Sequence, residues 1–556
     1  MKKTYLIKAL ALMLVLATLV TCFVACGEPQ TGTPTGTGSG DPSNTGDPSA
    51  PGSSNTPGSS DTPGSSNTPG SSNTPGSSNT PDVPGSSDPT GSTKVDDDPL
   101  ADLYEPAAKN YGYEFKIAAD SQQAWGLVHY AYMEGLTDSH GAVVNDALHE
   151  REVLMEGLYG VLVTLDTSAG GAGDLANRLK TQEGSQKYFA DLVFINGIAS
   201  MTAAQNGQLT NLLTLDALNL EAPYYDQRIQ QNYRINDMLF QLGGDFETID
   251  ELVTFGILYN DAIYKEKKYD QTEGSPYEMV SNYKWTYKKL LELAQPVVSN
   301  PDNTFDETDT IGLLSENQGG YYFFLGSGIR PIETTNGKMK VTLNDKTTYA
   351  TATQAIAAVA ELFTSGAVWR PAAATQTNMF IGDQALFRSS SLSTTLNGMP
   401  NMKSDFGILP IPMYQESQKA YYCSLNDDAN RPIIIPRHVE DVQVTSEILE
   451  IMCYYSRFGG DESLYESFFD RLQVAKICRK PEDRQMLMLI FSSKVYDMDR
   501  MFGNEWLGMH SKLSSYIGSD CITDINSTID NALSSKGGDK YISYITGLFS
   551  KNNAKK

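Results

Sequence analysis

Residues 27–98 form a long tract that cannot build a folded core, and this tract divides the chain into a short leader and a large body. It consists mainly of Gly, Ser, Thr, Pro, Asn and Asp, and a six-residue unit, Pro-Gly-Ser-Ser-Asn/Asp-Thr, recurs from Pro51 to Pro75. Such a segment buries too little apolar surface to offset the entropy of ordering it. We therefore predict a disordered linker over 26–100, with a typical reach of about 45–50 Å.

Residues 1–25 have the pattern of a secretion signal that ends at a lipidated cysteine. Basic residues precede an uncharged apolar run at 9–20, which is too short to span a bilayer. Ala25 stands directly before Cys26, as in a lipoprotein cleavage site, although Phe23 replaces the usual Leu. An alternative lipoprotein cleavage motif ends at Cys22. A secreted protein without a lipid anchor is a further alternative. Two acyl chains on Cys26 would give stable anchoring.

The body, residues 101–556, is long enough for two domains of ordinary size. Apolar runs alternate with segments of helical period, which favours an α/β architecture with right-handed crossovers. The expected strands are 113–118, 161–165 and 191–195, and the expected helices are 143–159, with Val144, Leu148, Met155 and Leu158 on its apolar side, and 170–186. The net charge of −25 repels phosphate backbones, so nucleic acid is not an expected partner.

The sequence lacks the common signatures of enzymes and metal sites. The five histidines form no HExxH or other metal spacing, and there is no G-x-S-x-G, P-loop or dinucleotide fingerprint. The composition does not exclude a catalytic pair of carboxylates of the glycosidase type, because acidic residues are numerous. Four body cysteines could pair in three ways or remain as buried free thiols, which we favour: Cys423, Cys453, Cys478 and Cys521. No metal and no cofactor are expected.

Seven segments in order resemble the extracellular solute-binding lipoproteins of ABC transporters, in the carbohydrate-binding form found in Gram-positive gut anaerobes. They are similar to the family's "NDAxxER", "DLV", "YND", "YELVxxGxWTxxKL", "FxxGxALF", "DFGILPxP" and "FxxxVYDL" motifs. In this sequence they are residues 145–151, 191–193, 254–261, 277–290, 380–387, 405–412 and 491–498.

The resemblance implies a two-lobed α/β fold of the periplasmic-binding-protein type (type II), whose lobes are joined by crossing hinge strands. Lobe 1 would take 101–253 with a return segment at about 420–460, and lobe 2 would take 254–417 with about 461–556. The protein would act as a monomer on the outer face of the cytoplasmic membrane. It would close on a small solute, most often a carbohydrate, and engage the permease subunits of the transporter.

One loop departs from the family pattern. Many relatives carry an aspartate-rich, calcium-like stretch, whereas residues 302–309 here lack the sixth-position Gly and terminal Glu of an EF-hand loop. We expect a solvated acidic loop there.

Saccharide sites need flat aromatic faces and polar groups for hydroxyls, and ligands of open α/β sheets bind where strands end. These criteria select seven candidate ligand-binding residues. The alternative for each of them is ordinary packing in the core or on the surface. The candidates are Trp125, Asn196, Asp245, Tyr321, Tyr322, Trp369 and Trp506. Trp285 lies inside a family packing motif and is assigned to the core.

The resulting expectation is a binding protein that captures an oligosaccharide for an ABC importer and performs no chemistry. A surface glycan-degrading enzyme or adhesin on the same linker is an alternative. A receptor of the same fold for peptides or another solute is a further one.

Overall fold

The computed structural model describes residues 109–120, 142–394, 399, 402–460, 463–468, 477–502, 507–515, 521–535 and 538–553. All of them belong to one compact unit, Thr90–Lys556. The predicted signal segment, Cys26, the linker, Trp125 and Trp506 lie outside the described residues. Among the described residues, no helix combines the length and apolarity needed to cross a bilayer.

The first sheet has four strands in the order β12-β3-β1-β2. Its strands are β1 (Tyr113–Asp120), β2 (Val161–Ala169), β3 (Leu192–Phe194) and β12 (Ile433–Ile434). β1 pairs in parallel with both β2 and β3, whereas β12 is antiparallel to β3. β3 is fully buried, as expected for an apolar run covered on both faces. The strands predicted at 113–118, 161–165 and 191–195 are therefore confirmed.

The helices that follow these strands are also close to the prediction. α3 (Ala142–Tyr159) and α4 (Ala172–Ser185) occupy the two expected ranges. α3 packs beside α16 (Val442–Phe458), where the Arg151 Nη1 atom donates to the Ser456 Oγ at 2.6 Å. The prediction that Leu158 belongs to the buried side of α3 is wrong, since it is 47% exposed and Tyr159 is buried instead. The reason is rotational: one further residue along the helix turns the side chain by about 100°.

The second sheet has five strands in the order β10-β4-β9-β5-β8. Its strands are β4 (Phe255–Asn260), β5 (Ile311–Ser315), β8 (Val368–Trp369), β9 (Ala385–Ser391) and β10 (Phe406–Pro410). β9 is central, parallel to β5 and antiparallel to β4. Trp285 is fully buried and packs on Phe387 of β9 at a ring separation of 5.5 Å, so its assignment to the core is confirmed.

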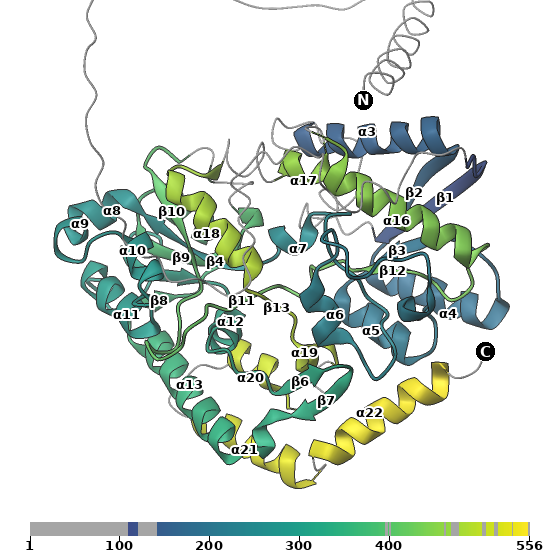
Figure 1. Ribbon diagram of the computed structural model, residues 1–556. Coiled ribbons are helices and arrows are strands. Elements are labelled where there is room, and N and C mark those ends of the chain that lie inside the picture. Colours follow the sequence, from purple (N-terminus) through teal and green to yellow (C-terminus); the bar gives the residue numbers. More distant parts are fainter. Residues whose placement is uncertain are drawn as a thin grey trace, which may run out of the picture. The chain divides into compact units, whose positions relative to one another are not determined.

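The other helices and strands cover and connect these sheets (Figure 1). They are α5 (Gly197–Gln205), α6 (Gln227–Tyr233), α7 (Ile249–Leu252), α8 (Asp261–Glu266), α9 (Tyr269–Thr272), α10 (Pro276–Ser281), α11 (Tyr287–Ala294), α12 (Gly319–Gly326), β6 (Ile332–Thr335), β7 (Lys338–Val341), α13 (Lys346–Thr364), α14 (Ala373–Ile381), β11 (Cys423–Ser424), α17 (Leu464–Glu466), α18 (Pro481–Ser492), β13 (Lys494–Val495), α19 (Met498–Met501), α20 (Met509–Ser515), α21 (Cys521–Ser535) and α22 (Gly538–Asn553).

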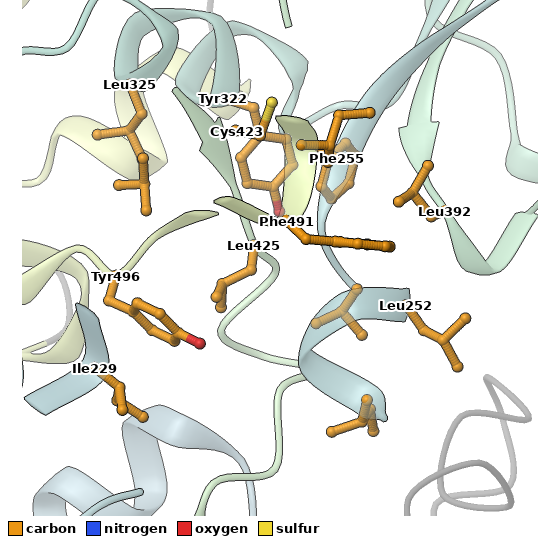
Figure 2. Packing of buried hydrophobic residues seen from close by; sticks show 14 of the residues in the cluster. Ile229, Leu252, Phe255, Tyr322, Leu325, Leu392, Cys423, Leu425, Phe491 and Tyr496 are labelled. Carbon is orange, nitrogen blue, oxygen red and sulfur yellow. The ribbon is translucent and has the colours of Figure 1, made fainter. Parts of the chain in front are cut away.

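Three chain segments run between the regions of the two sheets. β11 pairs in parallel with β13, and Thr254, just before β4, forms a bridge with Leu425. Apolar side chains, among them Phe255, Tyr322 and Leu425, fill the space around these segments (Figure 2). The rings of Phe255 and Tyr322 lie 3.9 Å apart. The crossing segments therefore share one apolar core with helix α12.

The end of the chain returns to the first sheet. The side-chain amide of Asn552, at the end of α22, donates to the carbonyl of Gln205 at 2.8 Å, and that of Asn553 donates to Ala204 at 3.0 Å. Both acceptors lie on α5.

Candidate functional site

The carboxyl ends of several strands bring acidic side chains close to one tyrosine hydroxyl. Glu316 directly follows β5, and Asp427 and Asp428 follow β11 within four residues. Tyr322 lies on α12, and its pKa is raised well above the usual value by burial and then by the negative charges of Glu316, Asp427 and Asp428. Arg500, on α19, opposes that shift. We call these five residues the strand-end cluster.

Two members of the strand-end cluster are joined by an ion pair. The Arg500 Nη2 atom lies 2.7 Å from the Asp428 Oδ2 atom, and 48% of the Asp428 side chain is exposed against 11% of that of Arg500. Asp428 therefore offers carboxylate oxygens at the surface while Arg500 holds it in place. The pair raises the pKa of Arg500, since burial is outweighed by Asp428 and Asp427.

The neighbouring Asp427 is buried and belongs to a chain of tyrosine contacts. It accepts a hydrogen bond from the hydroxyl of Tyr233 at 3.1 Å. Burial, reinforced by the charge of Asp497, raises the pKa of Asp427 well above its usual value, although Arg500 opposes the shift. Asp497 in turn accepts a hydrogen bond from the hydroxyl of Tyr321.

Asn196 lies at the edge of the strand-end cluster. It follows β3 and caps α5, where its Oδ1 atom accepts the Ala199 N–H at 2.8 Å. The next residue, Gly197, donates its N–H to the carbonyl of Asp427 at 3.2 Å. The structure thus joins the end of a first-sheet strand to the loop that carries Asp427 and Asp428.

Tyr321 and Tyr322 lie side by side on α12, and both are 2% exposed. The hydroxyl of Tyr322 donates to the Oε1 atom of Gln318, and its ring packs on Phe255. Their rings are therefore part of the core, and of their two hydroxyl groups that of Tyr321 donates to a carboxylate, Asp497. The ring of His510 packs against Tyr321 at 4.9 Å.

Two further candidate residues, Asp245 and Trp369, have their described contacts outside the strand-end cluster. Asp245 forms an ion pair with Arg457 at 2.8 Å, and burial raises the pKa of its carboxyl to about 6 even though Arg457 opposes the shift. Trp369, on β8 at the edge of the second sheet, is partly buried and faces the ring of Phe305 at 6.2 Å. The described contacts of these two residues do not include a member of the strand-end cluster.

No cation site emerges from the described side chains. They contain no group of three or more His, Cys, Asp or Glu residues that could hold a metal ion. In the acidic loop, Asp306 accepts hydrogen bonds from the backbone and the hydroxyl of Thr308 at 2.7 Å each, so it stabilises its own turn. Cys423 and Cys453 are buried free thiols, as expected, whereas Cys478 is a free thiol that is only partly buried.

Sequence reasoning missed Glu316, Asp427, Asp428 and Arg500. Glu316 could have been found, because it directly follows an apolar run of strand type at 311–315. The aspartates follow a strand of only two residues, and Arg500 lies on a helix of one turn. Their role depends on contacts between distant parts of the chain.

The fold as a whole is similar to that of proteins of known structure. No protein-family profile and no curated protein matches this sequence. Among solved structures, the chain is similar to a cyclo/maltodextrin-binding protein complexed with maltotetraose, with 14% identity, 76% of this chain and 97% of that chain covered, and a TM-score of 0.50. The chain has a periplasmic-binding-protein-like fold. The predicted fold class is thereby confirmed.

Two further solved structures are similar to this chain, with lower TM-scores and comparable coverage. One is an ABC substrate-binding protein from Listeria monocytogenes in complex with cycloalternan, at 12% identity, 76% and 99% coverage and a TM-score of 0.47. The other is UgpB from Mycobacterium tuberculosis in complex with glycerophosphocholine, at 13% identity, 72% and 95% coverage and a TM-score of 0.46.

Proposed function

We propose that this chain is an extracellular solute-binding protein that captures a saccharide and delivers it unaltered to an ABC importer. The observation that carries the proposal is the fold shared with the cyclo/maltodextrin-binding protein over 97% of that chain. That protein is complexed with maltotetraose. We infer the same kind of solute here, with the protein acting as a monomer.

The strand-end cluster supports a hydroxylated solute. Asp428 supplies exposed carboxylate oxygens that accept hydrogen bonds from sugar hydroxyls, and Glu316 is a second, partly buried carboxyl. Arg500 supplies N–H donors next to Asp428. Donors and acceptors side by side suit hydroxyl groups, which both donate and accept. Trp125 and Trp506 remain the proposed aromatic platforms.

Hinge closure and membrane anchoring belong to the same proposal. Lobe 1 is proposed to comprise 101–253 with about 420–460, and lobe 2 to comprise 254–417 with about 461–556. The three crossing segments would act as the hinge, and the closed form would engage the permease. Lipidation of Cys26 would hold the protein on the outer face of the cytoplasmic membrane.

Thermal unfolding of the full chain with a panel of oligosaccharides tests this proposal. A saccharide solute raises the Tm, with a stabilisation that grows as the logarithm of its concentration above Kd, and chromatography recovers it unchanged. Recovery of cleaved saccharide would establish an enzyme instead. A Tm increase with peptides and with no saccharide would overturn the sugar assignment while leaving the fold intact.

A further inference from the structure

Arg388 is a buried arginine that lacks the partners its charge requires. It lies on the central strand β9 and is 1% exposed. Its Nε and Nη1 atoms are buried without a hydrogen-bond partner among the described residues. Burial lowers the pKa of its guanidinium to about 10, which still leaves it positively charged at neutral pH.

Several other arginines are paired with carboxylates, whereas Arg330 and Arg431 donate to backbone carbonyls. The Nε atom of Arg228 donates to Asp226 at 2.9 Å, and Arg457 and Arg500 are each paired with an aspartate at 2.8 and 2.7 Å. A buried charge without such partners destabilises the folded state. Among the described residues, the Nε and Nη1 atoms of Arg388 have no internal acceptor.

The position of Arg388 connects it to the strand-end cluster. It is in register with Leu314 of β5, and alternate residues of a strand share one face. Ser390, two residues further along β9, donates its hydroxyl to the Oε1 atom of Glu316 at 3.3 Å. Phe387 packs on Trp285, and it projects from the opposite face. Arg388, Ser390 and Glu316 thus belong to one face near the carboxyl ends of β5 and β9.

The chemistry that satisfies a guanidinium is a planar oxyanion. A carboxylate accepts two parallel N–H bonds from arginine and carries one negative charge. Glu316 already places one negative charge near the guanidinium. A singly charged carboxylate therefore fits better than a doubly charged phosphate.

We propose that Arg388, with Ser390 beside it, binds a carboxylate of the solute, so that the solute is an acidic saccharide that contains a uronic acid. This inference rests on the proposed function and narrows its solute class.

The test compares acidic saccharides with the same saccharides after their carboxylates are reduced to alcohols. The probes are oligogalacturonides and glucuronate-bearing xylo-oligosaccharides, measured by thermal shift and calorimetry on the full chain. We expect the acidic forms to bind at least tenfold more tightly than the reduced forms. Equal binding of both forms would overturn this inference and leave the proposed function standing. If neither form binds and no other saccharide does, the proposed function fails with it.

Substitution of Arg388 separates a ligand role from a structural one. Arg388→Met is expected to abolish the preference for acidic forms and to raise the Tm of the ligand-free protein, because an unpaired buried charge is removed. Arg228→Met is the control and is expected to lower the Tm, because it leaves Asp226 with fewer partners. If Arg388→Met lowers the Tm as Arg228→Met does, the arginine is structural and the inference is wrong. Tighter binding of galactose 1-phosphate than of galacturonate would also overturn the carboxylate assignment.

Discussion

The ammonium group of Lys494 forms an ion pair with the carboxylate of Asp250, and 1% of the lysine side chain and 2% of the aspartate side chain are exposed. Glu251 and Asp226 lie 2.8 and 3.1 Å from the same Nζ atom. Lys494 belongs to β13, whereas the three acids lie on or just before α6 and α7. The ammonium group of Lys494 therefore links the crossing segment that contains β13 to α6 and α7, the helices that precede β4.

Replacement of this cation is expected to destabilise the protein strongly. Lys494→Met leaves buried carboxylates without their counter-charge, which costs about 3–5 kcal/mol of unfolding free energy. Lys284→Met is the control, because Lys284 and Glu416 form an ion pair with more than half of each side chain exposed. That change is expected to cost less than about 1 kcal/mol. Urea unfolding followed by circular dichroism measures both, and equal losses would refute the structural role of Lys494.

Gly407, on β10, is expected to tolerate no side chain. A Cβ atom there would lie 2.1 Å from the Tyr259 ring and 2.2 Å from the Tyr277 hydroxyl. Gly407→Ala should therefore destabilise the protein by about 1–3 kcal/mol. Gly157→Ala, on α3 with open space around it, should instead stabilise by up to about 1 kcal/mol. Thermal unfolding of the two variants should show opposite shifts, and shifts of the same sign would contradict the packing described here.

The pKa of His510 is expected to lie well below that of an ordinary histidine. Burial, with a contribution from Arg500, lowers its pKa to about 4. Between that value and about 6.5, the unfolded chain binds more protons at this site, so its contribution to stability falls as the pH is lowered through this window. Histidine-selective NMR gives the pKa directly, with His510→Asn to assign the signal. A measured pKa of 6 or above would contradict the buried contact with Tyr321.

Asp428 is expected to matter for binding and little for folding. If the strand-end cluster contacts the solute, Asp428→Asn should lower the affinity by at least tenfold, about 1.4 kcal/mol. Its effect on unfolding should stay at about 1 kcal/mol, since 48% of the Asp428 side chain is exposed and Asp427 still offsets the charge of Arg500. Asp166→Asn is a matched control, because Asp166 pairs with Arg178 at 2.7 Å with 44% of its side chain exposed. A similar loss of affinity in both variants would show that the strand-end cluster is not part of the solute-binding site.

The anchor can be tested without any ligand. Cys26→Ala should release the protein from the membrane fraction into the medium, because no thiol is left to accept the diacylglyceryl group. Cys22→Ala should leave the protein in the membrane fraction. Retention of the Cys26 variant together with release of the Cys22 variant would move the lipidation site to Cys22.

The sequence predicts those parts of the fold that local patterns determine. The runs around Phe115, Val163 and Val193 are rich in β-branched or aromatic residues, and each forms a strand. The site is harder to predict, because its residues come together through contacts between distant segments. Asp428 and Arg500 each look like an ordinary surface charge until the loop after β11 and the helix after β13 are placed together. Arg388 lies within a strand of typical sequence, and nothing local shows that its guanidinium is buried without partners.

The edge strand β12 has a consequence for how this protein is made. The fully buried strand β3 is complete once residue 194 is synthesised, but its antiparallel neighbour contains Ile433 and Ile434. Throughout the synthesis of the intervening chain, β3 presents an open apolar edge of the kind that promotes aggregation. A chain that ends between these points would therefore leave the edge of β3 unpaired, and it is expected to aggregate unless a chaperone covers that edge.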